Sequence, residues 1–284
     1  MRSKLFVPGA RPDLFGKALA SGADAVSIDL EDAVQEGRKS EARAATTDFV
    51  RSCQSPTPII VRVNAVGTDH FAADVEAIAW PGLYAINLPK CESANDIRAL
   101  AEALRRLEAA RGLAEPIGIL PTIESPRGLR LATEIATAHP RVLGLQLGLG
   151  DLFAPLGIDR ALTPAVQAAQ LAVRLAAGEA GIWALDTAFT KVADIAGYRS
   201  EAEHARQLGF IGKSCIHPSQ VPIANDVFRP SAEQIARAVR IVEAWRAAQR
   251  EGVGALLVDG HMIDLPFARE ADALVARARG MGLL

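Results

Sequence analysis

The chain has 284 residues, of which 50% are hydrophobic, 23% charged and 5% aromatic, a composition typical of a folded protein with a large core. Its 31 Lys and Arg residues against 33 Asp and Glu residues give a net charge of -2. The chain therefore lacks the strong positive field that attracts nucleic acid or an anionic membrane, and a small molecule is the expected partner.

The first apolar stretch, residues 5–10, has only six residues, which is too short for a secretory signal. No window reaches the ~18 consecutive apolar residues of a membrane span. We therefore expect a cytoplasmic protein. Its three cysteines would then stay reduced and serve as small packing residues; they are Cys53, Cys91 and Cys215.

Eight short apolar runs recur along the chain, each ending in polar or glycine residues and followed by an amphipathic stretch. They begin about 30 residues apart on average, the length of one strand-helix unit. Eight such units predict closure into a (β/α)8 TIM barrel, with an open parallel sheet as the alternative. The runs are 4–9, 25–32, 59–64, 85–90, 117–124, 142–151, 182–187 and 210–218.

The segments between the runs are predicted helices. In residues 93–111, Ile97, Leu100, Leu104 and Leu107 recur at intervals of three and four, and Gly112 ends the helix. No Gly-x-Gly-x-x-Gly follows the first run, which disfavours a dinucleotide-binding fold.

About 65 residues follow the eighth run. Ser231 and Gln234 form a capping box that opens an amphipathic helix, which could be the eighth barrel helix. Residues 255–266 then predict a strand-turn-strand arm, and 267–279 a short helix. We therefore expect a single domain over 1–284, with the barrel over about 1–252. The extension over about 253–284 would be a lid on its own barrel or an arm on a neighbouring subunit.

Polar residues at the ends of the predicted strands are candidates by position, because the carboxyl ends of barrel strands form the active-site face. Two carboxylates on adjacent strands, Glu124 and Asp151, suggest a shared divalent cation, with water and substrate completing its shell as is usual for Mg2+. The alternative is that each caps a helix or pairs with a basic residue. The other candidates at strand ends are Asp29, Glu31, Asp32, Arg62, Asn64 and Lys90.

Arg62 interrupts an apolar run that we expect to be buried on both faces, so it needs an anion. That anion is a substrate carboxylate or a developing enolate, or else Asp29 or Glu31 as a structural partner. Gly148 and Gly150 fit a loop that substrate or backbone approaches closely.

Lysines in two strand-end runs, Lys90 and Lys213, raise a Schiff-base aldolase as a competing mechanism. Because the sixth run ends in an aspartate, we interpret both lysines as partners of anions instead. The histidines lack zinc-site spacing, although His217 and His261 could touch ligand.

Eight motifs, in order along nearly the whole chain, resemble the citrate lyase beta subunit and malyl-CoA lyase family of the HpcH/HpaI aldolase/citrate lyase superfamily. The resemblance implies a (β/α)8 barrel, a homotrimer or hexamer, and Mg2+-dependent carbon-carbon cleavage or formation of a 3-hydroxyacyl-CoA thioester. The motifs are 5–9 (LFVPG), 29–34 (DLEDAV), 61–64 (VRVN), 88–90 (LPK), 123–125 (IES), 147–151 (LGLGD), 212–213 (GK) and 259–263 (DGHMI).

The resemblance also implies roles. Glu124 and Asp151 would hold the metal, and Arg62 would hold substrate carboxylate or stabilise the enolate. Asp259 is similar to an arm aspartate that, in relatives, enters a neighbouring subunit's site as acid or base. Substrate contacts are expected from Arg62, Glu124, Asp29, Glu31 and Lys90, and coenzyme A contacts from Phe6, Pro8, Lys213 and Pro218.

The chain departs from the family pattern at Asn87, where relatives commonly have arginine, and at 150–153, which replaces a more acidic stretch. Both departures leave the substrate open among citryl-CoA, malyl-CoA, citramalyl-CoA and related thioesters. The alternatives are a metal-dependent aldolase for a free 4-hydroxy-2-oxo acid, and a non-catalytic subunit that binds acyl carriers in a larger lyase complex with carrier and transferase subunits.

Overall fold

The computed structural model describes residues 1–284. Eight parallel strands close into a barrel, each strand pairing with the next in the chain and β8 pairing with β1. The predicted barrel is therefore confirmed, and the open sheet is not formed. The strands are β1 (Ser3–Pro8), β2 (Ala25–Asp29), β3 (Ile59–Arg62), β4 (Leu83–Leu88), β5 (Gly118–Ile123), β6 (Gly144–Leu147), β7 (Trp183–Asp186) and β8 (Gly212–Cys215).

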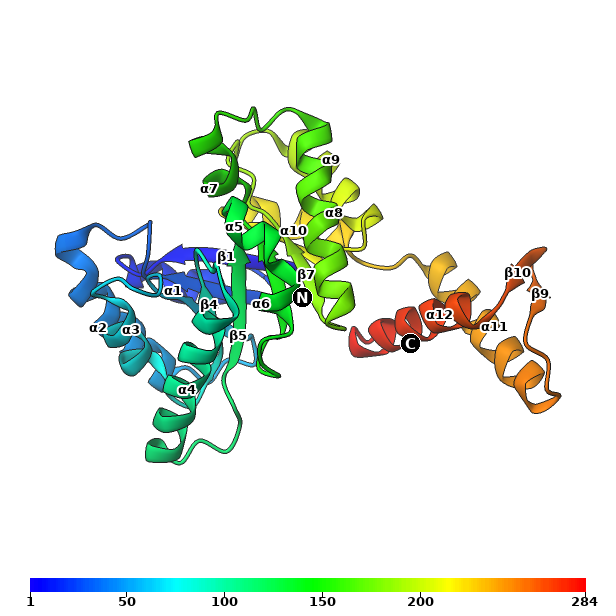
Figure 1. Ribbon diagram of the computed structural model, residues 1–284, viewed down its shortest axis with the longest axis horizontal. Helices are drawn as coiled ribbons and strands as arrows, with labels where there is room; N and C mark the ends of the chain where they lie inside the picture. Colours follow the sequence, from blue (N-terminus) through cyan, green and yellow to red (C-terminus); the bar gives the residue numbers. More distant parts are fainter. The chain divides into compact units, whose positions relative to one another are not determined.

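Helices follow every strand and lie outside the barrel (Figure 1). The predicted helix after β4 is confirmed: a capping box between Ser93 and Asp96 opens it, and Gly112 ends it with φ of 65°. The barrel helices are α1 (Phe15–Leu19), α2 (Lys39–Ser52), α3 (Phe71–Ile78), α4 (Ala94–Arg111), α5 (Pro126–Arg130), α6 (Ala132–Ala136), α7 (Leu149–Phe153), α8 (Thr163–Glu179), α9 (Ile195–Gln207) and α10 (Val221–Val227). No helix of the chain has the length and apolar character that crossing a bilayer requires.

Strand residues alternate between two environments. On β1, Leu5 and Val7 belong to the main core between strands and helices, so Lys4 and Phe6 face the barrel interior. At the amino end of the strands the interior is filled by a small apolar cluster. Its buried members are Ala25, Ile60, Ala85 and Leu120.

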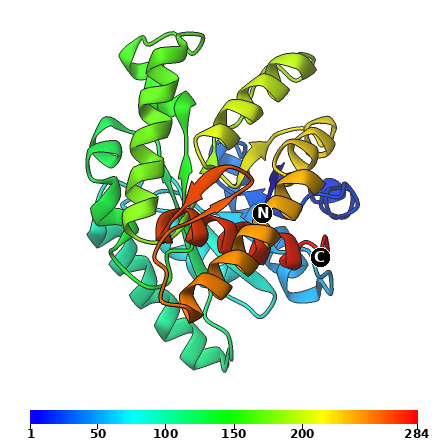
Figure 2. The same cartoon turned by 90° about the vertical axis from the view of Figure 1, so that its right-hand side faces the viewer.

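The chain divides into two compact units, Met1–Phe228 and Arg229–Leu284. The second unit holds α11 (Ala232–Arg250), the hairpin β9 (Leu256–Val258) and β10 (His261–Ile263), and α12 (Leu265–Gly280), seen in orange and red in Figure 2. Its own small core joins residues of α11, such as Trp245, to Val275 of α12.

This division differs from the expected boundary near residue 252. The capping box at Ser231 and Gln234 does open a long helix, but α11 packs on α12 and belongs to the second unit. The barrel ends instead with the short helix α10. The amphipathic pattern of 232–250 indicated a helix but could not indicate which element covers its apolar face.

Candidate active site at the barrel mouth

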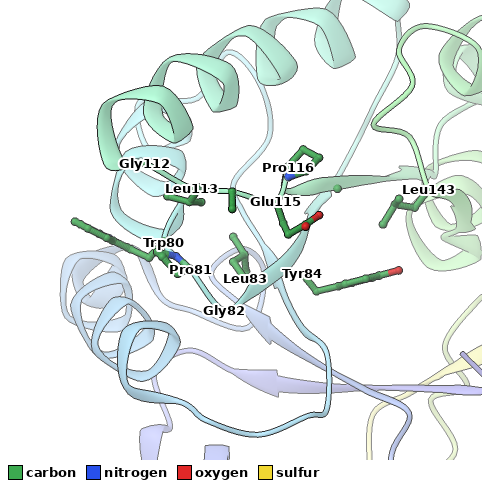
Figure 3. Close-up of a pocket in the computed structure, with 12 residues that line it drawn as sticks. Trp80, Pro81, Gly82, Leu83, Tyr84, Gly112, Leu113, Glu115, Pro116 and Leu143 are labelled. Atoms are coloured by element: carbon green, nitrogen blue, oxygen red, sulfur yellow. The ribbon is translucent and has the colours of Figure 1, made fainter.

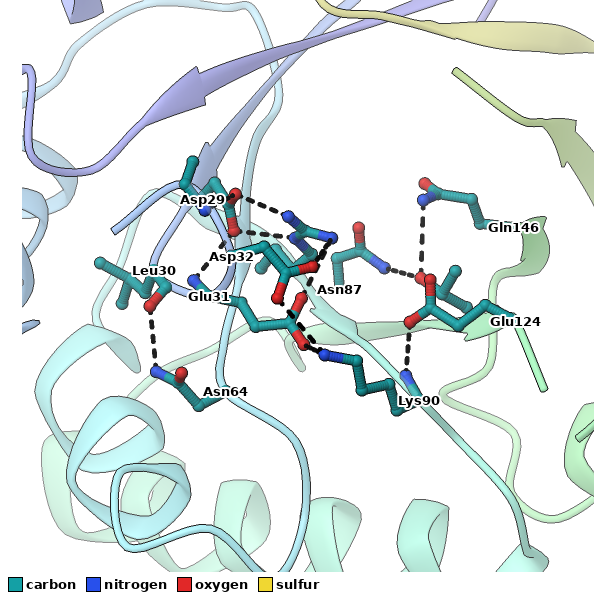
Figure 4. Close-up of polar contacts among 12 residues, drawn as sticks. Asp29, Leu30, Glu31, Asp32, Asn64, Asn87, Lys90, Glu124 and Gln146 are labelled. Carbon is teal, nitrogen blue, oxygen red and sulfur yellow. Dashed lines mark hydrogen bonds and ion pairs between the residues drawn. The ribbon is translucent and has the colours of Figure 1, made fainter. Parts of the chain in front are cut away.

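The carboxyl ends of β2 to β5 bring charged side chains together at one end of the barrel, which forms its mouth (Figure 4). Asp29 and Arg62 are paired in register on β2 and β3, and Arg62 is paired with Asn87 on β4. Residues paired in this way point to the same side of the sheet. The predicted cluster at the strand ends therefore exists.

Arg62 is held by Asp29 through two parallel hydrogen bonds. Its Nε lies 2.7 Å from Asp29 Oδ1 and its Nη2 lies 2.6 Å from Asp29 Oδ2. Although burial opposes it, the hydrogen bonds from Arg62 keep the pKa of Asp29 below its ordinary value. A third contact runs from Nη1 to Glu31 Oε2 at 3.1 Å. The structural partners considered from the sequence are thus in place, and substrate binding by Arg62 stays a prediction.

Lys90 sits in a turn with φ of 48°, a conformation uncommon for a residue with a side chain. Its ammonium lies 2.6 Å from Glu31 Oε1 and 3.3 Å from Asp32 Oδ1. In the same turn, its backbone N–H donates to Glu124 Oε1 over 2.6 Å. Lys90 therefore neutralises the carboxylates after β2 and orients the carboxylate after β5.

Glu124 is 4% exposed, and no basic side chain pairs with it within 4 Å. Burial raises the pKa of Glu124 to about 8, and the charge of Asp151 adds to the effect. Asp151 is exposed in the first turn of α7. Two neighbouring carboxylates without a counter-charge are the donor set that a divalent cation would satisfy.

The chain holds no cluster of three or more His, Cys, Asp and Glu side chains with metal-binding geometry. This is compatible with Mg2+, which is usually bound through one or two carboxylates and keeps several waters.

Gly148 makes room for Glu124. A Cβ at Gly148 would collide with Glu124 Oε2 and would lie 2.7 Å from Glu124 Cβ, whereas a Cβ at Gly150 would meet nothing within 4 Å. The chain itself comes close at Gly148, through the Glu124 side chain, and approach of substrate to either glycine stays a prediction.

We expect Gly148→Ala to weaken Mg2+ binding at least tenfold, because the added methyl must displace the Glu124 carboxylate. Gly150→Ala, two residues away, is the matched control and should bind Mg2+ as the wild type does. Calorimetric titration of both variants measures the difference. Equal affinities in the two variants would contradict a role for Glu124 as a metal ligand.

Lys213 does not lie where coenzyme A could reach it, which corrects its assignment as a cofactor contact. The side chain is fully buried, with Nζ 2.6 Å from Asp186 Oδ2 and 3.0 Å from Glu201 Oε2. The neighbour Cys215 belongs to the main core outside the barrel, so Lys213 points outward as well. Its role is a structural ion pair between β7, β8 and α9.

The other expected coenzyme A contacts lie at the surface of the mouth. Phe6 is half-buried, with its ring centroid 5.1 Å from Arg62 Cζ. Pro8 is half-buried at the end of β1, and Pro218 is exposed after β8. All three are accessible, and their contact with coenzyme A stays a prediction.

Asp259 lies in the turn between β9 and β10, with φ of 51°, and is exposed. Arg240 Nη2 lies 2.7 Å from its Oδ2, and this hydrogen bond lowers the pKa of Asp259. The residue belongs to the second unit, and its catalytic role stays a prediction.

A chain of polar side chains inside the barrel was not anticipated from the sequence. Lys4 donates to Asn87 Oδ1 over 2.6 Å, and Asn87 donates to Thr122 Oγ1 over 2.9 Å. Gln146 lies 3.5 Å from the same hydroxyl. For Asn87, Thr122 and Gln146 the available signal was alternation, since each stands between apolar neighbours in its run. Asn64, in contrast, is held by Asp74 at 2.6 Å and serves the loop after β3.

A cavity of about 640 Å³ lies near the opposite end of the strands (Figure 3). Apolar side chains dominate its lining, among them Trp80, Leu83, Tyr84 and Leu143. It contains none of the predicted site residues. Figure 3 therefore shows a feature of the barrel base, separate from the mouth.

The sequence of this chain is similar to one protein family and to lyases of known reaction. Residues 2–218 match the family described as HpcH/HpaI aldolase/citrate lyase. The chain is 36% identical to the citrate lyase subunit beta of Escherichia coli K12 over 99% of this chain and 94% of that protein. It is 33% identical to the L-malyl-CoA/beta-methylmalyl-CoA lyase of Cereibacter sphaeroides over 98% of this chain and 94% of that protein.

A solved structure of protein CitE from Mycobacterium tuberculosis, in complex with magnesium, acetoacetate and coenzyme A, superposes with a TM-score of 0.77 at 35% identity. The match covers 98% of this chain and 100% of that one. The resemblance carried by the motifs is confirmed along nearly the whole chain. The protein belongs to the HpcH/HpaI aldolase/citrate lyase family.

Proposed function

We propose that this protein is a Mg2+-dependent carbon-carbon lyase that cleaves or forms a 3-hydroxyacyl-CoA thioester, giving an acyl-CoA and a 2-oxo acid. Its citrate lyase and malyl-CoA lyase relatives support the reaction class. The observation that carries the proposal is Glu124, a buried carboxylate that no basic side chain pairs with and whose pKa burial and the charge of Asp151 raise to about 8. A divalent cation supplies the missing positive charge.

We assign Glu124 and Asp151 as the residues that would hold Mg2+. When bound, the ion supplies Lewis-acid polarisation and a chelation point for the 2-oxo acid. The charge balance of the mouth supports this assignment, because carboxylates outnumber cations there. The carboxylates are Asp29, Glu31, Asp32, Glu124 and Asp151, and the basic groups paired with them are Arg62 and Lys90.

Cleavage removes the proton from the 3-hydroxyl group, breaks the bond between the hydroxyl-bearing carbon and the α-carbon, and leaves the electron pair on the thioester as an enolate. Arg62, held rigid by Asp29 at 2.6 and 2.7 Å, places a fixed positive charge at the mouth to stabilise that enolate. Lys90 positions Glu124 through its backbone N–H and contributes a second positive charge.

Protonation of the enolate at the α-carbon completes the reaction. We assign both proton transfers to Asp259 of a neighbouring subunit: its carboxylate takes the proton of the 3-hydroxyl group and then returns a proton to the α-carbon. This assignment requires a homo-oligomer, expected to be a trimer or hexamer, in the cytoplasm. Phe6, Pro8 and Pro218 are the remaining candidates for contacts with coenzyme A. Lys213 has no part in this assignment.

The test is to incubate the purified chain with Mg2+ and citryl-CoA, malyl-CoA or citramalyl-CoA, and to quantify the acyl-CoA and the 2-oxo acid by chromatography. We expect equimolar products from at least one thioester and their loss on chelation of the metal. Turnover of a free 4-hydroxy-2-oxo acid alone would favour the aldolase alternative. Turnover of neither substrate, with binding of an acyl carrier, would favour a non-catalytic subunit.

A further inference from the structure

Lys4 carries a buried amine that the proposed mechanism does not use. It faces the barrel interior and is 0% exposed. Its Nζ lies 2.6 Å from Asn87 Oδ1 and 4.0 Å from the centroid of the Phe6 ring, and no carboxylate lies within 4 Å of it. Lys213 is also fully buried but has Asp186 as a counter-ion at 2.6 Å. An unpaired buried amine is costly when charged and therefore calls for an explanation.

The Lys4 amine lies in the barrel interior directly beneath the charged residues of the mouth. Asn87, its hydrogen-bond partner, is paired in register with Arg62 on the neighbouring strand. The Asn87 amide group donates to Leu120 O over 2.8 Å and to Thr122 Oγ1 over 2.9 Å, so its oxygen is fixed toward Lys4. The Lys4 amine therefore ends in the layer of the barrel that carries Arg62.

The other basic side chains of the mouth form ion pairs with carboxylates of the chain. Arg62 is bound by Asp29 and contacts Glu31, and Lys90 contacts Glu31 and Asp32. Lys4 is the basic side chain of this region without a carboxylate partner in the chain. Lys4 therefore offers a second anionic group of a ligand an amine that no carboxylate of the chain occupies.

Further polar atoms around the interior lack partners. The hydroxyl of Ser214, which is paired with Lys4 in register, is buried without a hydrogen bond. The Ser27 hydroxyl and the amide oxygen of Gln146 are also buried without a hydrogen bond. Gln146 is the last member of the hydrogen-bonded row of side chains that begins at Lys4. Buried hydroxyl groups of this kind can donate to a ligand oxygen.

We propose that Lys4 determines substrate specificity by pairing with a second carboxylate on the 2-oxo acid, the one that the metal does not chelate. The proposal rests on the proposed function and narrows its substrate to thioesters that release a 2-oxo dicarboxylic acid. A 2-oxo acid that carries a hydrogen or a methyl group in place of the group with the second carboxylate leaves the amine unpaired. The half-buried Phe6 ring lies against the amine, with its centroid 4.0 Å from Nζ, so the proposal requires this side chain to rotate when the carboxylate enters.

A proton should accompany the second carboxylate. Burial and the charge of Arg62 lower the pKa of Lys4 well below its ordinary value, while Asp29 and Glu124 oppose the effect. A carboxylate placed at the amine favours the charged form, so binding of the dicarboxylic acid draws a proton from solvent. A 2-oxo acid without that group should bind with no such uptake.

The experiment titrates the full chain, saturated with Mg2+, with freshly dissolved oxaloacetate and with pyruvate, in two buffers of different ionisation enthalpy. We expect the wild type to bind oxaloacetate at least about tenfold more tightly than pyruvate and to take up protons from the buffer with oxaloacetate only. Lys4→Met should abolish both the preference and the uptake while leaving pyruvate affinity unchanged. Lys17→Met, at an exposed lysine on α1, is the control.

The outcomes separate the two proposals. If Lys4→Met weakens both acids equally, Lys4 has only a structural role and the inference is overturned. It is also overturned if the wild type binds both acids with equal affinity. If neither acid binds the Mg2+-saturated wild type, the proposed function itself has failed. Should Lys4→Met not fold, Lys4→Gln and the proton uptake of the wild type give the same decision.

Discussion

Asp151→Asn should lower the rate of thioester cleavage at saturating substrate by about 1,000-fold or more, equivalent to about 4 kcal/mol of transition-state stabilisation. The substitution keeps the size of the side chain and removes one of the two carboxylates that we assign to Mg2+. Asp151 is exposed and forms no hydrogen bond within the chain, so the change should leave the fold intact. Steady-state kinetics over a range of Mg2+ concentrations is the measurement.

The matched control is Asp159→Asn. Asp159 is an exposed aspartate shortly after α7, and its Oδ1 accepts a hydrogen bond from the Ala161 N–H over 2.8 Å, which an asparagine oxygen can also accept. This variant should retain wild-type kinetics. If Asp151→Asn were equally active, the metal would have to be held by Glu124 alone, and the assignment of a two-carboxylate site would be abandoned.

The sequence was sufficient to predict the barrel because parallel strands are buried on both faces and appear as continuous apolar runs. Six of the eight runs contain an observed strand, and the runs 4–9 and 85–90 overlap β1 and β4, which begin one and two residues earlier. The position of the polar cluster followed from the same reasoning, since strand ends converge at one face of a closed barrel. Glu31, Arg62 and Lys90 are indeed brought into contact there.

The sequence could not give the direction of a side chain on a short strand. In residues 212–215, Lys213 shares its side of β8 with Cys215, and which side faces outward depends on where the strand begins. A shift of one residue reverses every side chain. The side on which Lys4 lies was open for the same reason. It stands at the polar start of the first run, but its side chain is buried in the barrel interior.

Partner choice among charged groups was also beyond the sequence. Arg62 could have met substrate, Asp29 or Glu31, and only the register between β2 and β3 places Asp29 opposite it. Competition of this kind is settled by distances of a few tenths of an ångström, which depend on strand stagger and twist. Spacing along the chain does not contain that information.

Asp259→Asn should reduce turnover by about 100- to 10,000-fold, the usual contribution of a positioned acid or base, with little effect on Mg2+ affinity. An aspartate is ionised at neutral pH, and the hydrogen bond from Arg240 lowers the pKa of Asp259 further, so the residue enters the reaction as the carboxylate that can accept a proton. An asparagine cannot take or return that proton. Asp272→Asn, at another exposed aspartate of the second unit, is the control and should be fully active.

Mixed oligomers test whether Asp259 serves the barrel of another subunit. If each site combines one chain's barrel with another chain's arm, co-producing Asp151→Asn and Asp259→Asn chains in equal amounts places an intact barrel beside an intact arm in about a quarter of the sites. Activity should therefore return to about a quarter of the wild-type value, although each variant alone is inactive. A site built within one chain predicts no recovery, because every chain carries one defect. Recovery thus identifies both the oligomer and the origin of the acid or base in a single measurement.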